Sequence, residues 1–181
     1  MAFDIAFRAL TDEFVDRLPA FKCGRESLDA FLLDDAPSYH KHGLTHTTLV
    51  FVEGDPAIAG FFCLSSDSVN LTTYEAGELA LPFEAPLKFF PAVKITRFGI
   101  LLKHQRAGLG LQLIEAIEGL VYADGSSPVA TRLLTVDAVN EDDVIAFYSK
   151  AKFLPCLEAE KKSQKQKRDT ILMYKDIYAE A

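Results

Sequence analysis

The stretch Gln105-Arg106-Ala107-Gly108-Leu109-Gly110 is the part of this chain from which we predict its fold. An apolar run at 93–102 precedes it and is typical of a buried strand, and the segment 111–117 that follows has apolar residues at helical spacing. A strand, a glycine-rich turn and a helix start form an arrangement that binds phosphate. Glycine lets the backbone approach an anion, and the first N–H groups of a helix are available to it. The alternative is a tight turn without a ligand, since glycine is common in turns as well.

Length and composition are those of an ordinary globular domain. The chain has 181 residues, of which 49% are hydrophobic and 25% are charged, and we expect one domain over residues 1–181. No apolar run approaches the roughly 20 residues that cross a bilayer, and Asp4 and Arg8 interrupt the first apolar stretch, which is unlike a signal peptide. Cys23, Cys63 and Cys156 lie far apart, without metal-ligand spacing. We therefore expect a reduced, cytoplasmic protein with no metal and no membrane partner.

The net charge of −7 argues against a protein that binds nucleic acid through its bulk charge. Basic residues are nevertheless concentrated in one stretch, 161–168, and others are scattered around the expected ligand side. We interpret the basic stretch as a solvated loop, and the alternative is a contact with an anionic partner. The scattered basic residues are Lys22, Arg25, Lys41, Arg97, Lys103, Arg106, Lys150 and Lys152.

The rest of the chain alternates between strand and helix patterns. Strands are expected at 4–10, 45–52, 57–65, 93–102, 132–139, 153–157 and 170–174, with a hairpin turn at 53–56. Helices are expected at 26–36, where Pro37 ends the pattern, from 111 to about 122, and up to about 151 after capping acceptors at 140–143. Residues 66–92 form a partly irregular connection with three prolines, and 124–128 form a loop. The pattern predicts a mixed α/β fold with one sheet.

The glycine turn resembles that of the GNAT superfamily of acyltransferases. The superfamily's turn is written (Arg/Gln)-x-x-Gly-x-(Gly/Ala), and Gln105, Gly108 and Gly110 fill this pattern. The resemblance covers essentially the whole chain. It implies an α/β (α+β) fold in which a single mixed, mostly antiparallel central sheet of about six or seven strands is flanked by about four helices.

The second half of the chain resembles the superfamily's Asn…Tyr…Gly-Phe signature. Asn140, the pair Phe147-Tyr148 on the following helix, and Phe153 correspond to it, whereas Lys152 stands where glycine is usual. This departure concerns the local turn.

Further segments resemble the acetyltransferase toxins of type II toxin–antitoxin systems. They are Phe21-Lys22-Cys23-Gly24, Leu28-Asp29-Ala30-Phe31-Leu32, Gly60-Phe61-Phe62-Cys63-Leu64-Ser65 and Arg97-Phe98-Gly99-Ile100. In this group the substrate is typically the amino group of an aminoacyl-tRNA, the partner is a small ribbon-helix-helix antitoxin, and homodimers are common. The resemblance therefore implies these partners for this chain.

Acetyl-CoA is the cosubstrate that the resemblance implies. The backbone N–H groups from about Arg106 to Leu111 can receive its pyrophosphate, and the Arg106 side chain either adds a charge-assisted contact or stays solvated. In the superfamily the strand that holds Phe98 to Ile100 here pairs with the pantetheine arm, and Asn140 would hydrogen-bond that arm or, alternatively, cap the next helix. The expected cofactor-binding residues are Phe98, Gly99, Ile100, Gln105, Arg106, Ala107, Gly108, Leu109, Gly110, Leu111 and Asn140.

Tyr148 is the expected catalytic residue. A phenol is protonated at neutral pH and can donate its proton to the thiolate that leaves when an amine attacks a thioester. The alternative is a core aromatic beside Phe147.

No general base is evident, and none of the four histidines has a carboxylate at a spacing that would orient it. An α-amine with a pKa of about 7.7–8.0 is partly neutral without a base, which favours an α-amine acceptor. Arg97 is expected on the acceptor side or, alternatively, in an internal salt bridge.

Three functions remain open from the sequence. The first is a toxin that acetylates aminoacyl-tRNA, and the second is an acetyltransferase for a small amine or a protein N-terminus. The third is a CoA-binding module without catalysis. The acceptor-binding loops carry no motif that decides between them.

Overall fold

The computed structural model describes residues 2–122, 129–161 and 168–179. The chain divides into two compact units, Met1–Ser65 with Ile95–Glu115, and Ser66–Lys94 with Ala116–Ala181. The loop expected at 124–128 and most of the basic stretch at 161–168 lie outside the described residues.

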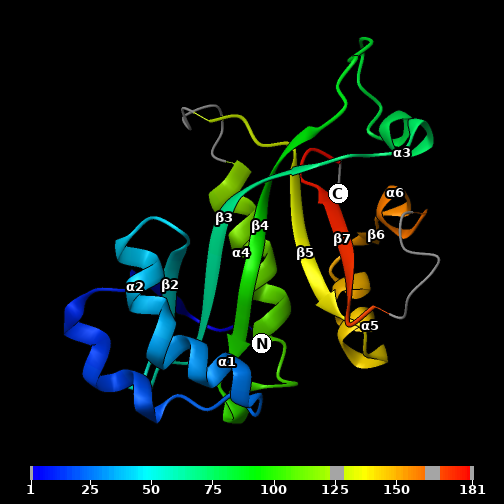
Figure 1. Ribbon diagram of the computed structural model, residues 1–181. Helices are drawn as coiled ribbons and strands as arrows, with labels where there is room; N and C mark the ends of the chain where they lie inside the picture. The colour runs from blue at the N-terminus through cyan, green and yellow to red at the C-terminus, as the bar shows by residue number, and fades with distance from the viewer. Residues whose placement is uncertain (1, 123–128, 162–167, 180–181) are drawn as a thin grey trace. The chain divides into compact units, whose positions relative to one another are not determined.

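The strands form one seven-stranded sheet in the order β1-β2-β3-β4-β5-β7-β6 (Figure 1). Antiparallel pairs join β1 (Ile5–Ala9) to β2 (His46–Val52) and β2 to β3 (Gly60–Val69). Antiparallel pairs also join β5 (Leu133–Val139) to β7 (Thr170–Asp176) and β7 to β6 (Leu154–Pro155). The fourth strand, β4 (Phe90–Ile100), lies between β3 and β5. The expectation of a single, mostly antiparallel sheet of about six or seven strands is confirmed.

The helical part of the first unit differs from the sequence prediction at Pro37. A 3-10 helix, η1 (Asp12–Ala20), precedes α1 (Glu26–Ala30), a π-helical turn η2 (Phe31–Asp35) and α2 (Ala36–Lys41). The prediction that Pro37 ends the helix is wrong, because the helix continues to Lys41. Pro37 lies in the first turn of α2, where a missing N–H and a fixed φ are tolerated. The π-helical turn η2 lies directly before α2.

The core of the first unit packs these helical segments against β2 and β3. Phe14, Phe21, Leu32, Leu49 and Phe61 are buried together there, and Leu32, Leu49 and Phe61 have no exposed surface. Full burial of one such side chain stabilises a fold by about 1.5–3 kcal/mol. The apolar pattern that predicted a helix at 26–36 therefore has its partner in the strands that follow it.

Residues 66–92 of the second unit are more regular than expected. The strand β3 extends to Val69, and α3 (Thr73–Glu78) follows with a capping box between Thr72 and Glu75. Glu75 is 2% exposed, and its carboxylate accepts from Thr72 N and from Leu157 N, each at 2.8 Å. Leu157 begins α6 (Leu157–Lys161), so this buried carboxylate joins α3 to α6. Among the described residues, 79–89 keep the expected irregular path.

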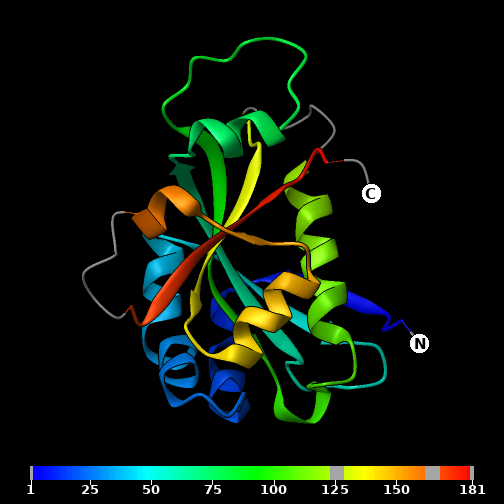
Figure 2. The same cartoon turned by 90° about the vertical axis from the view of Figure 1, so that its right-hand side faces the viewer.

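The second unit also contains the helix that carries the expected catalytic tyrosine. This helix, α5 (Asp142–Lys150), follows β5 directly and lies beside it (Figure 2). Its C-terminus has the hydrogen bonds of a Schellman motif, from Phe153 N to Tyr148 O at 3.0 Å and from Lys152 N to Ser149 O at 2.9 Å. Lys152 has a φ of 67°, in the left-handed region that this motif requires. The residue that replaces the superfamily's glycine thus adopts a glycine conformation.

Lys152→Gly should stabilise the protein. A non-glycine residue in the left-handed region costs about 1 kcal/mol, and glycine removes that cost at a position that is already outside the helix. We expect the free energy of unfolding to rise by about 1 kcal/mol and the melting temperature by about 2–4 °C, measured by circular dichroism. Lys150→Gly, within α5, is the matched control and should lower stability. A lower melting temperature for Lys152→Gly would contradict the assignment.

Candidate active site

The turn between β4 and α4 (Leu109–Tyr122) belongs to the first unit and has two residues in the left-handed region. A short 3-10 helix, η3 (Leu102–His104), follows β4, and Arg106 and Gly108 then have φ values of 57° and 94°. Such a conformation costs about 1–3 kcal/mol for a residue like Arg106, so neighbouring contacts must hold it. No described atom lies within 4 Å of the position that a Gly108 Cβ would occupy, and the space beside the turn is therefore open.

The N-terminus of α4 presents backbone donors beside this space. The first helical bond recorded among the described residues runs from Gln112 N to Gly108 O at 3.2 Å. The N–H groups of Leu109, Gly110 and Leu111 therefore have no acceptor within the helix. Leu109 is fully buried and fixes the helix end in the core. Unpaired N–H groups at the positive end of a helix dipole suit a diphosphate.

Gln105, an expected cofactor-binding residue, uses its side chain for hydrogen bonds within the protein. Its Nε2 donates to Cys23 O at 2.7 Å and to Ile100 O at 2.8 Å, and its backbone N donates to Leu102 O at 3.2 Å. An amide nitrogen has two hydrogens, so both side-chain donors are used. Gln105 fastens the turn to the end of β4 and to the segment before α1, and its side chain has no donor left for the cofactor.

The end of β4 that we expect beside the pantetheine arm approaches β3 at two glycines. A Cβ on Gly60 would lie 2.9 Å from Gly99 O, and a Cβ on Gly99 would lie 2.6 Å from Cε1 of Phe61. Neither position can hold a side chain without a shift of its neighbours. Phe98 and Ile100, on either side of Gly99, are half-buried. The strand is thus packed tightly against Phe61, and its pairing with pantetheine stays a prediction.

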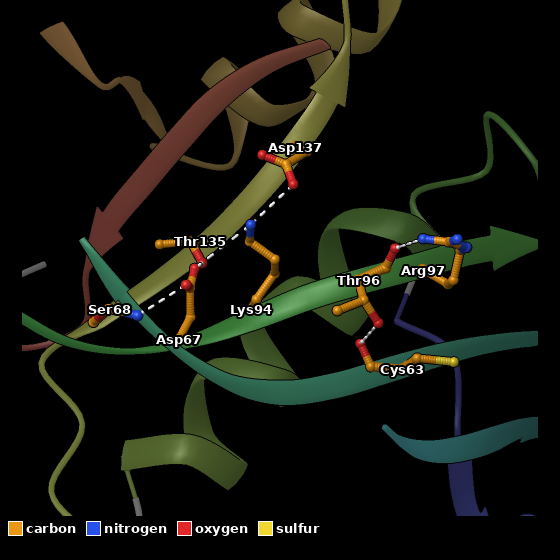
Figure 3. A network of polar contacts seen from close by, with 8 residues as sticks. All are labelled: Cys63, Asp67, Ser68, Lys94, Thr96, Arg97, Thr135 and Asp137. Carbon is orange, nitrogen blue, oxygen red and sulfur yellow. Dashed lines mark hydrogen bonds and ion pairs between the residues drawn. The ribbon is translucent and has the colours of Figure 1, made fainter. Parts of the chain in front are cut away.

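Arg97 lies on the surface of the same strand. Its guanidinium lies over the Phe31 ring, 4.7 Å from the centroid, and its Nη1 donates to Thr96 O at 2.7 Å (Figure 3). Within the described residues Arg97 forms no ion pair, so the interpretation as an internal salt bridge is wrong. Its positive charge therefore remains available at the surface, as the acceptor-side hypothesis requires.

A polar network within the second unit was missed by the sequence analysis. Lys94 Nζ lies 2.9 Å from Asp137 Oδ2 and 3.7 Å from Asp67 Oδ2 (Figure 3). Asp67 also accepts from Thr135 Oγ1 at 2.6 Å and from Ser68 N at 2.8 Å. The network links β3, β4 and β5. No sequence spacing could have indicated it, because its members come together only through strand pairing.

Asn140 lies at the end of β5 in the second unit. Its Nδ2 donates to Arg168 O at 3.0 Å, and its backbone N donates to Asp169 O at 2.9 Å. The N-cap of α5 is Glu141, so the interpretation of Asn140 as the helix cap is wrong. The amide oxygen of Asn140 has no partner among the described residues and could accept a hydrogen bond from a ligand.

Tyr148 is buried in α5 of the second unit, with 6% of its surface exposed. Its ring meets Phe147 and Phe153 edge-on, with centroids 5.1 Å and 5.5 Å apart. Burial raises the pKa of its hydroxyl above the usual value, so the phenol is protonated at neutral pH. No hydrogen bond of this hydroxyl is found among the described residues. A protonated phenol without an internal acceptor suits a proton donor, while its ring contacts also suit the alternative of a core aromatic.

Other reactive side chains are held in unreactive or paired states. Burial raises the pKa of the Cys23 thiol to about 11 and raises the pKa values of Cys63 and Cys156, so none is a thiolate nucleophile at neutral pH. His104 Nε2 lies 2.7 Å from Asp55 Oδ2, a pairing that sequence spacing did not indicate. Within the described part of the chain, no group of three or more His, Cys, Asp or Glu side chains could hold a metal ion.

Comparison with known proteins identifies the fold. No protein-family model and no curated protein matches the chain. The structure is similar to that of a mutant AtaT toxin bound to acetyl-CoA and the C-terminus of the antitoxin AtaR, with 21% identity, a TM-score of 0.68, and coverage of 96% of this chain and 94% of that chain. It is also similar to AtaT complexed with acetyl-methionyl-tRNAfMet, with 21% identity, a TM-score of 0.71 and 94% coverage of both chains. A KacT mutant with tyrosine changed to phenylalanine has 19% identity, a TM-score of 0.73, and coverage of 96% and 95%.

These similarities show that the chain has the GNAT fold of these toxins, as the sequence motifs implied. None of the described helices is both long and apolar enough to cross a membrane.

Gly108→Val should weaken the binding of acetyl-CoA. Valine is disfavoured at a φ of 94°, so the turn must change its backbone path and its N–H groups no longer converge. We expect the dissociation constant, measured by calorimetry, to rise by about tenfold or more, which corresponds to about 1.4 kcal/mol. Gly43→Val, at another left-handed glycine of the first unit, is the control for backbone strain alone. Equal affinity in Gly108→Val and the parent would refute a phosphate site at this turn.

Proposed function

We propose that this chain is an acetyl-CoA-dependent N-acetyltransferase that acetylates the α-amine of aminoacyl-tRNA, as the toxin of a type II toxin–antitoxin pair. The observation that carries the proposal is the open turn at 105–108, followed by the unpaired N–H groups of α4, in a fold shared with an acetyl-CoA-bound toxin. The proposal treats both units as one domain over residues 1–181.

The residues at the turn suit the anionic part of acetyl-CoA. The N–H groups of Leu109 to Leu111 would hold the diphosphate, and Arg106 is exposed on the turn itself. The exposed Lys22 lies beside η3, because its backbone oxygen accepts from Leu102 N at 3.0 Å. Basic side chains therefore lie near the turn in a chain whose net charge is −7, which supports an anionic ligand there.

The proposed reaction needs one proton donor. Acetyl-CoA would supply its acetyl group as a thioester. The acceptor nitrogen forms a bond to the acetyl carbon as the C–S bond breaks, and Tyr148 donates its hydroxyl proton to the leaving sulfur. The proton that the nitrogen loses as it becomes an amide passes to water, and the Tyr148 phenolate regains a proton from water. The acceptor must arrive as a neutral amine. A free α-amine, with a pKa of about 7.7–8.0, loses its proton to water without a dedicated base. The three protonated cysteines are consistent with direct transfer, without an acyl-cysteine intermediate.

The complexes of similar proteins support the macromolecular partners. AtaT has been solved with acetyl-methionyl-tRNAfMet and with the C-terminus of AtaR. By analogy we propose an aminoacyl-tRNA substrate and a ribbon-helix-helix antitoxin for this chain, together with a cytoplasmic location and a homodimeric state. Arg97 is the residue that we assign to the acceptor side, because its charge is exposed and forms no ion pair within the described residues.

A transfer assay with charged tRNA tests the substrate. We expect the purified protein to move radiolabelled acetyl groups from acetyl-CoA to methionyl-tRNA, and its expression to arrest growth. Label that appears on small amines or protein N-termini, but not on aminoacyl-tRNA, would support the second function considered from the sequence. Binding of acetyl-CoA without transfer to any of these acceptors would leave a non-catalytic CoA-binding module.

Tyr148→Phe should abolish most of the turnover. The substitution removes the proton donor and keeps the ring between Phe147 and Phe153, so we expect kcat to fall by roughly 10²–10⁴-fold with little change in CoA affinity. The matched control is Tyr174→Phe, at another buried tyrosine whose pKa is raised by burial, and it should retain kcat within a few-fold. A Tyr148→Phe enzyme within a few-fold of the parent would mean that this tyrosine is only a core residue.

A further inference from the structure

The carboxylate of Asp55, in the hairpin turn between β2 and β3, accepts hydrogen bonds from three donors. Its Oδ2 accepts from Lys103 Nζ at 2.6 Å and lies 2.7 Å from His104 Nε2, and its Oδ1 accepts from Ala57 N at 3.0 Å. The hydrogen bonds from Lys103 and Ala57 hold the pKa of this carboxyl well below its usual range. Asp55 is thus a fixed negative charge that joins the β2–β3 turn to η3.

The residues that contact Asp55 lie directly before the turn that we propose as the cofactor site. Lys103 and His104 are the last residues of η3, and Gln105 and Arg106 follow directly. Arg106 is exposed in the left-handed region, and no described contact holds it from outside the turn. Its conformation therefore depends on how the two ends of the turn are fixed, since a strained backbone persists only where its surroundings determine it.

The other end of the turn is fixed by the N-terminal segment. Phe3 N donates to Gln112 Oε1 at 2.8 Å, and Gln112 Nε2 donates to Phe3 O at 2.6 Å, so the first turn of α4 is held at two points. The Phe3 ring also meets the His104 ring edge-on, with centroids 6.1 Å apart. His104 therefore lies in contact with Phe3 and with Asp55.

We infer that Asp55 is a positioning residue for coenzyme binding: by holding Lys103 and His104 it sets the path of the turn at 105–108 that receives the diphosphate. This inference rests on the proposed function for the identity of the ligand. Asp55 acts through η3 and touches neither the cofactor nor the reacting atoms.

The sign of the effect separates positioning from simple charge attraction. Asp55 is an anion close to a proposed anion site, and its neutralisation would also release the positive charge of Lys103. Coulomb's law alone therefore predicts that Asp55→Asn binds CoA more tightly. A positioning role predicts the opposite, because the turn loses its anchor and part of the binding free energy is spent on ordering it.

The experiment measures CoA binding to the full chain by calorimetry at fixed ionic strength. For Asp55→Asn we expect the dissociation constant to rise by roughly three- to tenfold. Glu53→Gln is the matched control, because it removes one negative charge from the same turn at an exposed side chain that, among the described residues, forms no hydrogen bond or ion pair with η3. This control should bind CoA as tightly as the parent or slightly more tightly. In the transfer assay, KM for acetyl-CoA should rise in Asp55→Asn while kcat stays within about twofold of the parent.

Several outcomes would overturn the inference. Unchanged or tighter CoA binding by folded Asp55→Asn would do so, as would a loss of kcat with unchanged KM, which is the result expected from a smaller folded fraction. If Asp55→Asn does not fold, His104→Phe keeps a ring beside Phe3 and removes the link to Asp55, and it should weaken CoA binding as well. A parent protein that binds CoA but does not acetylate methionyl-tRNA would contradict the proposed function, while the calorimetric comparison would still test Asp55.

Discussion

The candidate site depends on a turn whose backbone would not keep its conformation by itself. Arg106 and Gly108 both lie in the left-handed region, and no described atom lies within 4 Å of the position that a Gly108 Cβ would occupy. The turn is held at its ends, by the two hydrogen bonds of the Gln105 amide and by the contacts of η3 and α4. The N–H groups at the start of α4 have no acceptor within the helix, so they can bind a ligand.

In the second unit, the raised pKa of the Tyr148 hydroxyl results from burial. Removal of the Tyr148 hydroxyl from water disfavours its anion, and the ring is fixed between two other aromatic rings. The Schellman motif after α5 places Phe153 against that ring at the expense of a left-handed lysine. Lys152 shows that the geometry of this motif is retained even where the residue that best fits it is absent.

The sequence also led to interpretations that the structure corrected, each for a local reason. Pro37 does not end its helix, because it lies in the first turn of α2, where its missing N–H is tolerated. Asn140 does not cap α5, because its amide is bonded to the segment before β7. Gln105 matches the coenzyme motif and its side-chain donors bind backbone oxygens, so its role toward the coenzyme stays a prediction. For these three residues the sequence indicated the kind of local role that the residue type favours, whereas it did not indicate the hydrogen-bond partner or the neighbouring turn.

The amino-acid sequence by itself indicated the seven strands in chain order, the helical segments around α1, α4 and α5, and the glycine turn before α4, while the mostly antiparallel arrangement was implied by the family resemblance. The strands, these helices and the turn follow from apolar periodicity and from glycine's backbone freedom, which are local properties. Only the tertiary structure decided which side chains that are distant in the sequence come into contact. Asp55 contacts His104 over 49 positions, and Gln112 contacts Phe3 over 109. The Lys94 network likewise joins three strands. Such pairs depend on strand order and register, because two residues far apart in the chain carry no local signal of their contact.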